Sequence, residues 1–398
     1  MKVGIVGNNV SAITLAKRLR DRDPSAEIVV FSKESFPYYQ RPKLIDLLAG
    51  ECEEKDIYFY PPAWYEKNRI DVRLSDPVLS VDPGSMTLKT ASGEIKADRI
   101  VIASGASSFV PPIPGSGLGG VFCHRTLDDC RAIKSAAAAS TNTVIIGGGV
   151  LGLETAGAIR KLNPNATVTV LEVMPWLLPR QLDPEGAAVL VSLLAARGIP
   201  VRTGVAIKGL LGGKKVGEID LGGERLPADL VVVSAGVRPE LGFLASSGLA
   251  IKKGVVVDDF LETSSRGIFC LGDAAEHRGT VYGIIKPAID MADVAASNIL
   301  AAGSKEYRGS LVSRNTKILD SYLLSVGDFS PADEKDCRVV RVVEKSEYRK
   351  FTVRGNSLVG LLSIGRRLPE MKVQQMIGSK TDISSILDKM RSLDYNFS

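Results

Sequence analysis

The chain has 398 residues, which is too long for a single hydrophobic core and predicts two or three domains. Apolar residues make up 45% and charged residues 24% of the sequence, and no apolar run reaches the ~18 residues of a membrane span, so a globular protein without a membrane partner is expected. The net charge of +5 lies in residues 301–398, which hold 17 Lys/Arg against 12 Asp/Glu, and no nucleic-acid partner is expected.

Cysteine and histidine usage narrows the chemistry. The five cysteines form no C-x-x-C pair and only two histidines are present, so neither a disulfide framework nor a cysteine or multi-histidine metal site is expected. The N-terminus shows no signal-peptide pattern. These features predict a cytoplasmic protein that holds no metal.

The first predicted unit is a strand at 2–6, a turn, a helix at 12–20 and a strand at 27–31. The turn follows the dinucleotide fingerprint G-x-G-x-x-G imperfectly, because Asn9 replaces the middle glycine and Ala12 is an accepted variant of the last. Asparagine tolerates unusual backbone angles, but its side chain must turn away from a phosphate. The residues predicted to meet a dinucleotide here are Gly7, Asn9, Ser11 and Ala12.

Two features after this unit have alternative interpretations. The acid expected to bind ribose hydroxyls is either Glu34 or is displaced by Lys33, and we favour Glu34. The loop at 36–44 carries Arg41, Pro42 and Lys43, and it either meets a pyrophosphate or flavin ring or is an exposed loop.

The next segment predicts a hairpin and a buried strand. Residues 72–81 and 85–90 alternate like paired strands around a turn at 82–84. The strand at 98–103 ends in Ser104 and Gly105. A linker at 110–115, stiffened by prolines, leads to a helix that opens at 125–129.

The stretch at 143–172 is the strongest motif in the chain. A β-branched strand, a glycine turn, a helix and a second β-branched strand ending in Glu172 follow one another in the order of a Rossmann fingerprint. The free N–H groups and the dipole of the helix N-terminus suit a pyrophosphate, and Glu172 suits ribose hydroxyls. The residues predicted to form this cradle are Gly147, Gly149, Val150, Leu151 and Gly152. The alternative is a parallel β-α-β core with incidental glycines.

A second copy of the same plan follows. A helix at 183–196 precedes a buried strand at 229–234 that runs to Gly236, which repeats the ending at Ser104 and Gly105 and indicates an internal duplication. A further apolar strand runs into Gly272 and Asp273, which either places a carboxylate beside a ligand or forms a simple turn. A helix at 288–300 starts with Pro287 in its first turn.

From residue 311 the pattern changes to short strands at 321–326, 338–343, 348–353 and 357–364, finished by a helix near 383–393. This predicts a separate small α+β domain.

Taken together, these motifs resemble those of the FAD- and NAD(P)H-dependent oxidoreductases with two dinucleotide domains, above all the NADH:rubredoxin/ferredoxin reductases and the flavoprotein part of assimilatory nitrite reductases. The segments that carry the resemblance are 7–12, 39–42, 104–105, 147–154, 235–239 and 272–283. The resemblance implies an α/β fold of two Rossmann-like domains, with the NAD domain inserted in the FAD domain, plus the C-terminal α+β domain. The implied boundaries are 1–105 with 240–305 for FAD, 106–239 for NAD, and 306–398 for the C-terminal domain.

The resemblance also implies roles for single residues. Val78 would meet adenine through its backbone, Arg41 the FAD phosphate or ring edge, and Asp273 the ribityl and pyrophosphate region. Lys286 would meet the pyrimidine side of the flavin, and Glu154 would lie near the nicotinamide. Glu154 and Lys43 are the candidate catalytic residues. Three departures concern individual FAD contacts: Asn9 for a glycine, Asp46 where many relatives carry a lysine that Lys43 could replace, and Ser107 where some carry an arginine.

The resemblance implies a flavoenzyme that passes electrons from NADH through FAD to a small redox protein, such as a rubredoxin or ferredoxin, or to a partner reductase subunit. Without a cysteine pair, disulfide chemistry is not expected. An NADH oxidase and a flavoprotein subunit or scaffold of a larger complex are the alternatives. The oligomeric state is left open.

The basic excess of residues 301–398 suggests an acidic partner, although such an excess is usually only a solvated surface. The basic residues predicted to face it are Arg338, Arg341, Lys345, Arg349, Lys350, Arg354, Arg366 and Arg367.

Overall fold

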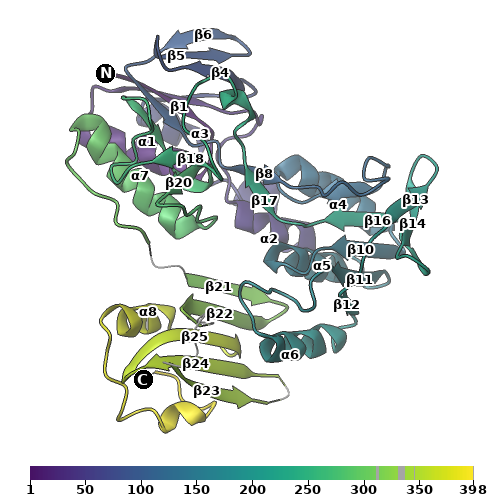
Figure 1. Cartoon of the computed structure of the whole chain (residues 1–398). Helices are drawn as coiled ribbons and strands as arrows, with labels where there is room; N and C mark the ends of the chain where they lie inside the picture. Colours follow the sequence, from purple (N-terminus) through teal and green to yellow (C-terminus); the bar gives the residue numbers. More distant parts are fainter. Residues whose placement is uncertain (311–312, 330–336, 345, 398) are drawn as a thin grey trace. The chain divides into compact units, whose positions relative to one another are not determined.

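The computed structural model describes residues 1–310, 313–329, 337–344 and 346–397 (Figure 1). The chain forms two compact units. The first contains Met1–Lys43, Glu53–Ser107 and Val237–Ser310, and the second contains Leu44–Cys52, Ser108–Gly236 and Leu311–Ser398. We keep the three domains predicted above as proposed boundaries.

The first unit is built on a five-stranded parallel sheet of order β19-β7-β1-β2-β3. Its strands are nearly continuous apolar runs because helices cover a parallel sheet on its faces. Helices α1 and α7 lie side by side (Figure 1). A three-stranded antiparallel sheet, β4-β5-β6, is added between β3 and β7 in the sequence.

The elements of the first unit are β1 (Lys2–Val6), α1 (Val10–Arg22), β2 (Glu27–Phe31), α3 (Pro62–Lys67), β3 (Ile70–Arg73), β4 (Val78–Asp82), β5 (Thr87–Thr90), β6 (Gly93–Lys96), β7 (Arg99–Ile102), β18 (Val255–Val257), β19 (Ile268–Cys270), β20 (Ala275–His277) and α7 (Ile285–Leu300). Two further short strands are β8 (Ala106–Ser108) and β17 (Val237–Pro239).

The second unit repeats this plan. Its parallel sheet has the order β12-β11-β10-β16-β9, which matches β3-β2-β1-β7-β19 strand for strand, and it too carries a three-stranded antiparallel sheet, β13-β14-β15. The internal duplication and the fold class predicted from the sequence are therefore confirmed.

The elements of this part are α2 (Leu44–Ala49), β9 (Val121–Cys123), α4 (Leu127–Ala139), β10 (Asn142–Ile146), α5 (Val150–Leu162), β11 (Thr167–Glu172), α6 (Pro184–Ala195), β12 (Val201–Thr203), β13 (Gly209–Gly212), β14 (Val216–Asp220), β15 (Arg225–Pro227) and β16 (Leu230–Val233).

The C-terminal part of the second unit is an antiparallel sheet of order β21-β22-β25-β24-β23 with one helix, α8. Alternation along β24 divides its side chains between the two faces. Phe351 joins a core with Val373 of α8 and Phe397 near the C-terminus, whereas Tyr348 and Lys350 point to the opposite face. The elements are β21 (Ser313–Ile318), β22 (Ser321–Gly327), β23 (Cys337–Val343), β24 (Tyr348–Arg354), β25 (Ser357–Gly365) and α8 (Glu370–Gly378).

Two sequence predictions about local structure were wrong, and one strand was missed. The helix expected near 383–393 is absent; that segment consists of turns with a short 3-10 helix at Lys389–Arg391, and the helix of this domain is α8. The strand expected at 72–81 is split, since β3 joins the parallel sheet and only β4 enters the hairpin sheet. Strand β21 was not predicted, because its polar sequence, SRNTKI, lacks a clear alternation.

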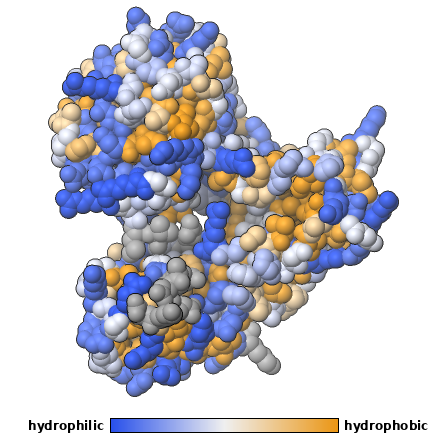
Figure 2. Space-filling view, viewed as in Figure 1, coloured by the Kyte–Doolittle hydropathy of each residue, from blue (hydrophilic) through white to orange (hydrophobic). Residues whose placement is uncertain are grey.

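The surface hydropathy and the cysteines bear on whether the chain could span a membrane, form a disulfide or hold a metal. Figure 2 shows hydrophilic and apolar residues interspersed on the visible face of each unit. Across the described residues, no helix combines the length and apolar character needed to cross a bilayer. No disulfide links any of the five cysteines, and no group of three metal-ligating side chains forms within the described ranges.

Candidate dinucleotide sites

The first fingerprint sits where β1 turns into α1. Gly7 has φ of +113°, and a Cβ there would lie 2.2 Å from the carbonyl oxygen of Ala103, at the end of β7. Only glycine meets both conditions, so Gly7 fixes the crossing of the chain over the neighbouring strand. Ser11 lies opposite Gly272, where a Cβ would come within 2.8 Å of the Ser11 hydroxyl oxygen. The tertiary fold therefore brings the fingerprint and the Gly272–Asp273 motif together.

Asn9 takes the place of the middle glycine and caps α1. Its Oδ1 accepts hydrogen bonds from the N–H groups of Ser11 (3.1 Å) and Ala12 (3.3 Å), and its Nδ2 donates to the carbonyl of Ala103 (2.6 Å). The side chain thus uses N–H groups that a pyrophosphate would otherwise share.

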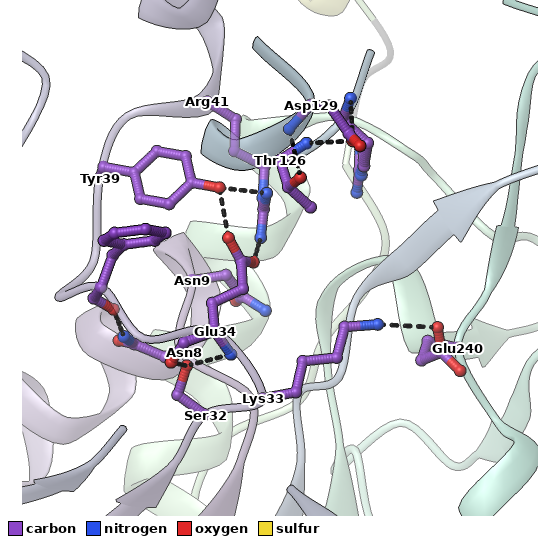
Figure 3. Close-up of polar contacts among 12 residues, drawn as sticks. Asn8, Asn9, Ser32, Lys33, Glu34, Tyr39, Arg41, Thr126, Asp129 and Glu240 are labelled. Carbon is purple, nitrogen blue, oxygen red and sulfur yellow. Dashed lines mark hydrogen bonds and ion pairs between the residues drawn. The ribbon is translucent and has the colours of Figure 1, made fainter. Parts of the chain in front are cut away.

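Glu34 lies after β2 in a three-residue polar cluster (Figure 3). One carboxylate oxygen accepts from the hydroxyl of Tyr39 (2.5 Å) and the other from the guanidinium of Arg41 (2.5 Å), which also donates to Tyr39 (2.8 Å). Lys33, the alternative to Glu34, instead pairs with Glu240 at 3.1 Å. Glu34 therefore holds the predicted cationic loop against the end of β2.

The remaining FAD candidates of the first unit lie at loop and strand ends. Ser104 donates its hydroxyl to the carbonyl of Glu240 (2.8 Å), and Gly105 follows with φ of +73°. Val78 begins β4 and is buried. Pro42 belongs to the 3-10 turn Arg41–Lys43.

Two lysines proposed for the flavin are bound to protein groups. The ammonium of Lys43 donates to the carbonyl of Asp56 (2.9 Å). Lys286, in the first turn of α7, is 73% exposed and pairs with Asp290 at 2.5 Å. Both partners lie outside the fingerprint, and the roles of the two lysines toward a flavin stay proposals that rest on the resemblance.

The second fingerprint is a complete glycine cradle. A Cβ on Gly147, whose φ is +116°, would lie 2.2 Å from the carbonyl of Ser234, and a Cβ on Gly152 would lie 2.1 Å from the carbonyl of Gly147. Gly149 differs, since a Cβ there would meet nothing within 4 Å. Gly149 is also the N-cap of α5 without a side-chain cap, so the N–H groups of Val150 and Leu151 begin the helix beside open space. Gly236, after β16, also opens onto free space with φ of +100°.

Glu172 ends β11 and is only 7% exposed. Its two carboxylate oxygens accept from the N–H groups of Gly148 (2.7 Å) and Met174 (2.7 Å). These bonds hold the carboxylate beside the glycine turn, and each oxygen retains a lone pair for a ligand hydroxyl.

Glu154 lies one turn into α5. Its carboxylate accepts a hydrogen bond from the hydroxyl of Thr316 on β21 (2.6 Å). Burial raises the pKa of Glu154; the Thr316 hydroxyl opposes this shift, and the charge of Asp46 adds to it. Thr316 is a partner that sequence reasoning missed, because 162 residues separate the two and no local pattern marks it.

The segment Leu44–Cys52 was predicted to belong to the FAD domain, yet it joins the second unit. The thiol of Cys130 and the ammonium of Lys134, both on α4, donate to the carbonyls of Leu44 (3.4 Å) and Leu47 (2.8 Å). Glu51 pairs with Lys161 of α5. Such side-chain to backbone contacts leave no trace in local periodicity.

The residues present fit two dinucleotides. In the second unit, the open space at Gly149, the uncapped N–H groups and the buried Glu172 suit a pyrophosphate and its ribose. In the first unit the close crossing at Gly7 and the close approach of Ser11 to Gly272 form the same type of cradle, in which Asn9 and Ala12 replace the second and third glycines.

Two Rossmann-like units of identical strand order, each with a glycine-lined helix N-terminus, define a dinucleotide-dependent oxidoreductase. A family model described as pyridine nucleotide-disulphide oxidoreductase matches residues 1–298. The chain therefore belongs to this family of flavoproteins, whose members of this type bind FAD and NAD(H), and the resemblance found in the sequence is confirmed.

Similar proteins include the nitrite reductase [NAD(P)H] of Bacillus subtilis (strain 168), which is 31% identical over 385 residues covering 96% of this chain and 47% of that protein. The chain therefore spans less than half the length of that relative. The rubredoxin-NAD(+) reductase of Ectopseudomonas oleovorans is 32% identical over 311 residues, or 75% of this chain and 80% of that protein. The crystal structure of NADH:rubredoxin oxidoreductase from Clostridium acetobutylicum matches with a TM-score of 0.82 at 27% identity and covers 98% of each chain.

Replacing Asn9 tests whether its amide competes with FAD. We expect Asn9→Gly to tighten FAD binding by freeing the N–H groups of Ser11 and Ala12. Asn9→Asp should weaken binding by about tenfold or more, because a carboxylate there keeps the cap and repels a pyrophosphate. Flavin fluorescence quenching on titration of the apoprotein measures both effects, with the apoprotein unfolding midpoint as control. Identical FAD affinity in all three proteins would show that the pyrophosphate does not use this helix end.

Proposed function

We propose that this chain oxidises NADH, uses FAD as the intermediate carrier, and passes electrons to a small redox protein or to a partner reductase subunit. The observation that carries the proposal is the pair of dinucleotide cradles in one chain, one of them ending in Glu172, together with five cysteines that form no disulfide. Two cradles suit transfer between two dinucleotides, and without a cysteine pair no internal disulfide receives the electrons. The absence of disulfides among these cysteines also fits the cytoplasmic location predicted from the sequence.

The residues of the chain bind and orient the dinucleotides. The N–H groups at the start of α5 would hold the NADH pyrophosphate, Glu172 would hold the adenosine ribose, and Glu154 would lie beside the nicotinamide. Ser11, Ala12 and Asp273 would hold FAD in the first unit. When bound, FAD can accept a hydride and release electrons one at a time.

The choice of acceptor is supported by the relatives. Two of those described above are named for rubredoxin and one for nitrite reductase, so a small electron carrier and a partner reductase subunit are the acceptors we propose. An acidic partner is supported less strongly than the sequence suggested. Arg349 and Lys350 are 1% and 2% exposed, so their prediction as surface residues was wrong. Lys345 lies outside the described residues.

The other five basic residues are exposed. Arg341, Arg354 and Arg366 pair with Glu185, Asp328 and Glu347. Arg338 forms no ion pair with the acidic residues that the structure describes, and the guanidinium of Arg367 lies 5.8 Å from the ring centroid of Tyr322. These two arginines are the positions at which we propose that an acidic partner is attracted.

The acceptor proposal is tested with NADH-dependent reduction of an acidic rubredoxin across a salt series. We expect strong reduction at low salt that falls steeply as salt rises, because attraction between exposed charges mainly raises the association rate and is screened within about 10 Å at 0.1 M. Reduction of ferricyanide should fall much less. Arg338→Glu with Arg367→Glu should slow rubredoxin reduction, whereas Lys89→Glu with Lys96→Glu, the same number of exposed charges reversed on β5 and β6, should not. Fast NADH oxidation with dioxygen alone would instead identify an oxidase.

A further inference from the structure

We propose that Thr316 of the C-terminal sheet is a positioning residue for the nicotinamide end of the NAD site, acting through Glu154. The proposal rests on the proposed function, since the place of Glu154 near the nicotinamide comes from the resemblance. The direct observation is the 2.6 Å hydrogen bond from the Thr316 hydroxyl to the Glu154 carboxylate.

The face of α5 that meets β21 is shaped for this contact. Glu154, Gly157 and Lys161 are spaced by three and four residues, so they lie on one face of the helix. A glycine inside a helix lowers its stability by up to about 1 kcal/mol relative to alanine, so Gly157 calls for a packing reason. A Cβ on Gly157 would lie 2.5 Å from Cδ2 of Leu319. The helix therefore carries a notch that admits this leucine.

Leu319 is placed by a strained turn. Strands β21 and β22 are joined by Leu319 and Asp320 alone, since Ile318 pairs with Ser321. Both turn residues have positive φ, +47° and +68°, the pattern of a type I′ turn. Leucine rarely adopts a positive φ. The hairpin therefore places Leu319 in the notch with a backbone conformation that is unfavourable for this residue type. A glycine on the helix and a left-handed leucine on the hairpin meet at one point, which sets the position of β21 along α5.

The C-terminal sheet is also held at a second place. Asp183, the N-cap of α6, accepts from the hydroxyl of Tyr348 (2.6 Å) and pairs with the ammonium of Lys350 (3.2 Å). Both β24 side chains are buried. The hydroxyl of Tyr348 therefore serves as a matched control, since it belongs to the same sheet and donates to a carboxylate of the same unit, but not to Glu154.

The hydrogen bond between Thr316 and Glu154 prepares the carboxylate for the nicotinamide. Donation from Thr316 fixes the orientation of the Glu154 carboxylate and stabilises its charged form against burial and against the charge of Asp46. A carboxylate held in this way is ready to accept a hydrogen bond from the carboxamide of the nicotinamide. The C-terminal sheet is then part of the site that recognises the nicotinamide half of the cofactor.

The test compares NAD⁺ with ADP-ribose, which lacks the nicotinamide, by isothermal titration calorimetry on the purified full chain. Thr316→Val keeps the side-chain shape and removes the hydroxyl. We expect it to weaken NAD⁺ binding by about tenfold and to leave ADP-ribose unchanged, in line with the loss of a hydrogen bond to a charged group. Thr316→Ser should restore the wild-type ratio, and Tyr348→Phe should not alter it.

Two further measurements separate positioning from general loosening. Gly157→Ala forces the Leu319 side chain, or the hairpin that carries it, to shift without replacing Thr316 or Glu154, and should alter the ratio in the same direction. In a Glu154→Gln background, Thr316→Val should have little further effect. The acid limb of NAD⁺ affinity should also move to higher pH in Thr316→Val, because loss of the donor raises the pKa of Glu154 further.

The possible outcomes distinguish failure of the proposed function from failure of the role proposed for Thr316. Wild-type protein that binds neither ligand overturns both the proposed function and this inference. Wild-type protein that binds NAD⁺ more tightly than ADP-ribose, with the same ratio in Thr316→Val, overturns the inference alone. Equal weakening of both ligands by Thr316→Val also overturns it, since that is the behaviour of a hydroxyl that only supports the fold.

Discussion

Replacing Gly149 with alanine is expected to abolish tight NADH binding and to leave the fold intact. A methyl group on Gly149 would meet no protein atom within 4 Å, and its φ of −78° suits alanine. The same methyl would stand where we propose that the pyrophosphate approaches the N-terminus of α5, so we expect a loss of about 3 kcal/mol, or two orders of magnitude in affinity. Titration with NADH, followed by its fluorescence, measures the effect.

Gly147→Ala is the matched control and should behave in the opposite way. Its methyl group would lie 2.2 Å from the carbonyl of Ser234 at a φ of +116°, so strand β10, strand β16 or the turn must shift. We expect about 3–4 kcal/mol of destabilisation, measured by urea unfolding of the apoprotein. A Gly149→Ala protein that binds NADH like the wild type would show that the pyrophosphate lies elsewhere.

Glu172→Ala is expected to reduce a preference for NADH over NADPH. The carboxylate accepts two backbone hydrogen bonds and is buried, so a ribose with free hydroxyls gains a partner there, whereas a 2′-phosphate meets a negative charge. We expect the wild type to prefer NADH, and the substitution to reduce that preference by about 1–3 kcal/mol. The ratio of kcat/KM for the two cofactors measures the preference.

The substitution has a second effect that the measurement must separate. Without Glu172, the N–H groups of Gly148 and Met174 lose their acceptors, so both cofactors should bind less tightly. Glu172→Gln is the control, because it removes the charge and keeps a side chain of the same size. Equal kcat/KM for NADH and NADPH in the wild type, or a preference for NADPH, would refute the assignment of Glu172 to the ribose.

Much of the fold could be predicted because the pattern of a parallel β-α-β unit is present in short, continuous segments of the sequence. Strands β1 and β2 and the glycine turn between Ile146 and Val150 follow from apolar runs and from positions that only glycine tolerates. The terminal helix was misplaced because residues 383–393 contain apolar residues at helical spacing, but these enter the core through turns instead. The strand β21 was missed because its polar residues are stabilised by pairing with β22 and by contacts outside the strand.

Some features of the candidate sites were also predictable from the sequence, whereas others depend on the fold. The sequence by itself determined the two fingerprints, the duplication and the place of Glu172 as the candidate acid after the second fingerprint. Backbone geometry and phosphate binding require particular residue types at fixed spacing. Only the tertiary structure decided that Asn9 caps its own helix, that Glu34 is held by Tyr39 and Arg41, and that Leu44–Cys52 joins the second unit. It alone placed Thr316 on Glu154 and buried Lys350 beside Asp183. These contacts join side chains far apart in the chain or select one partner among several nearby, and such choices depend on distance and burial, which no local pattern encodes.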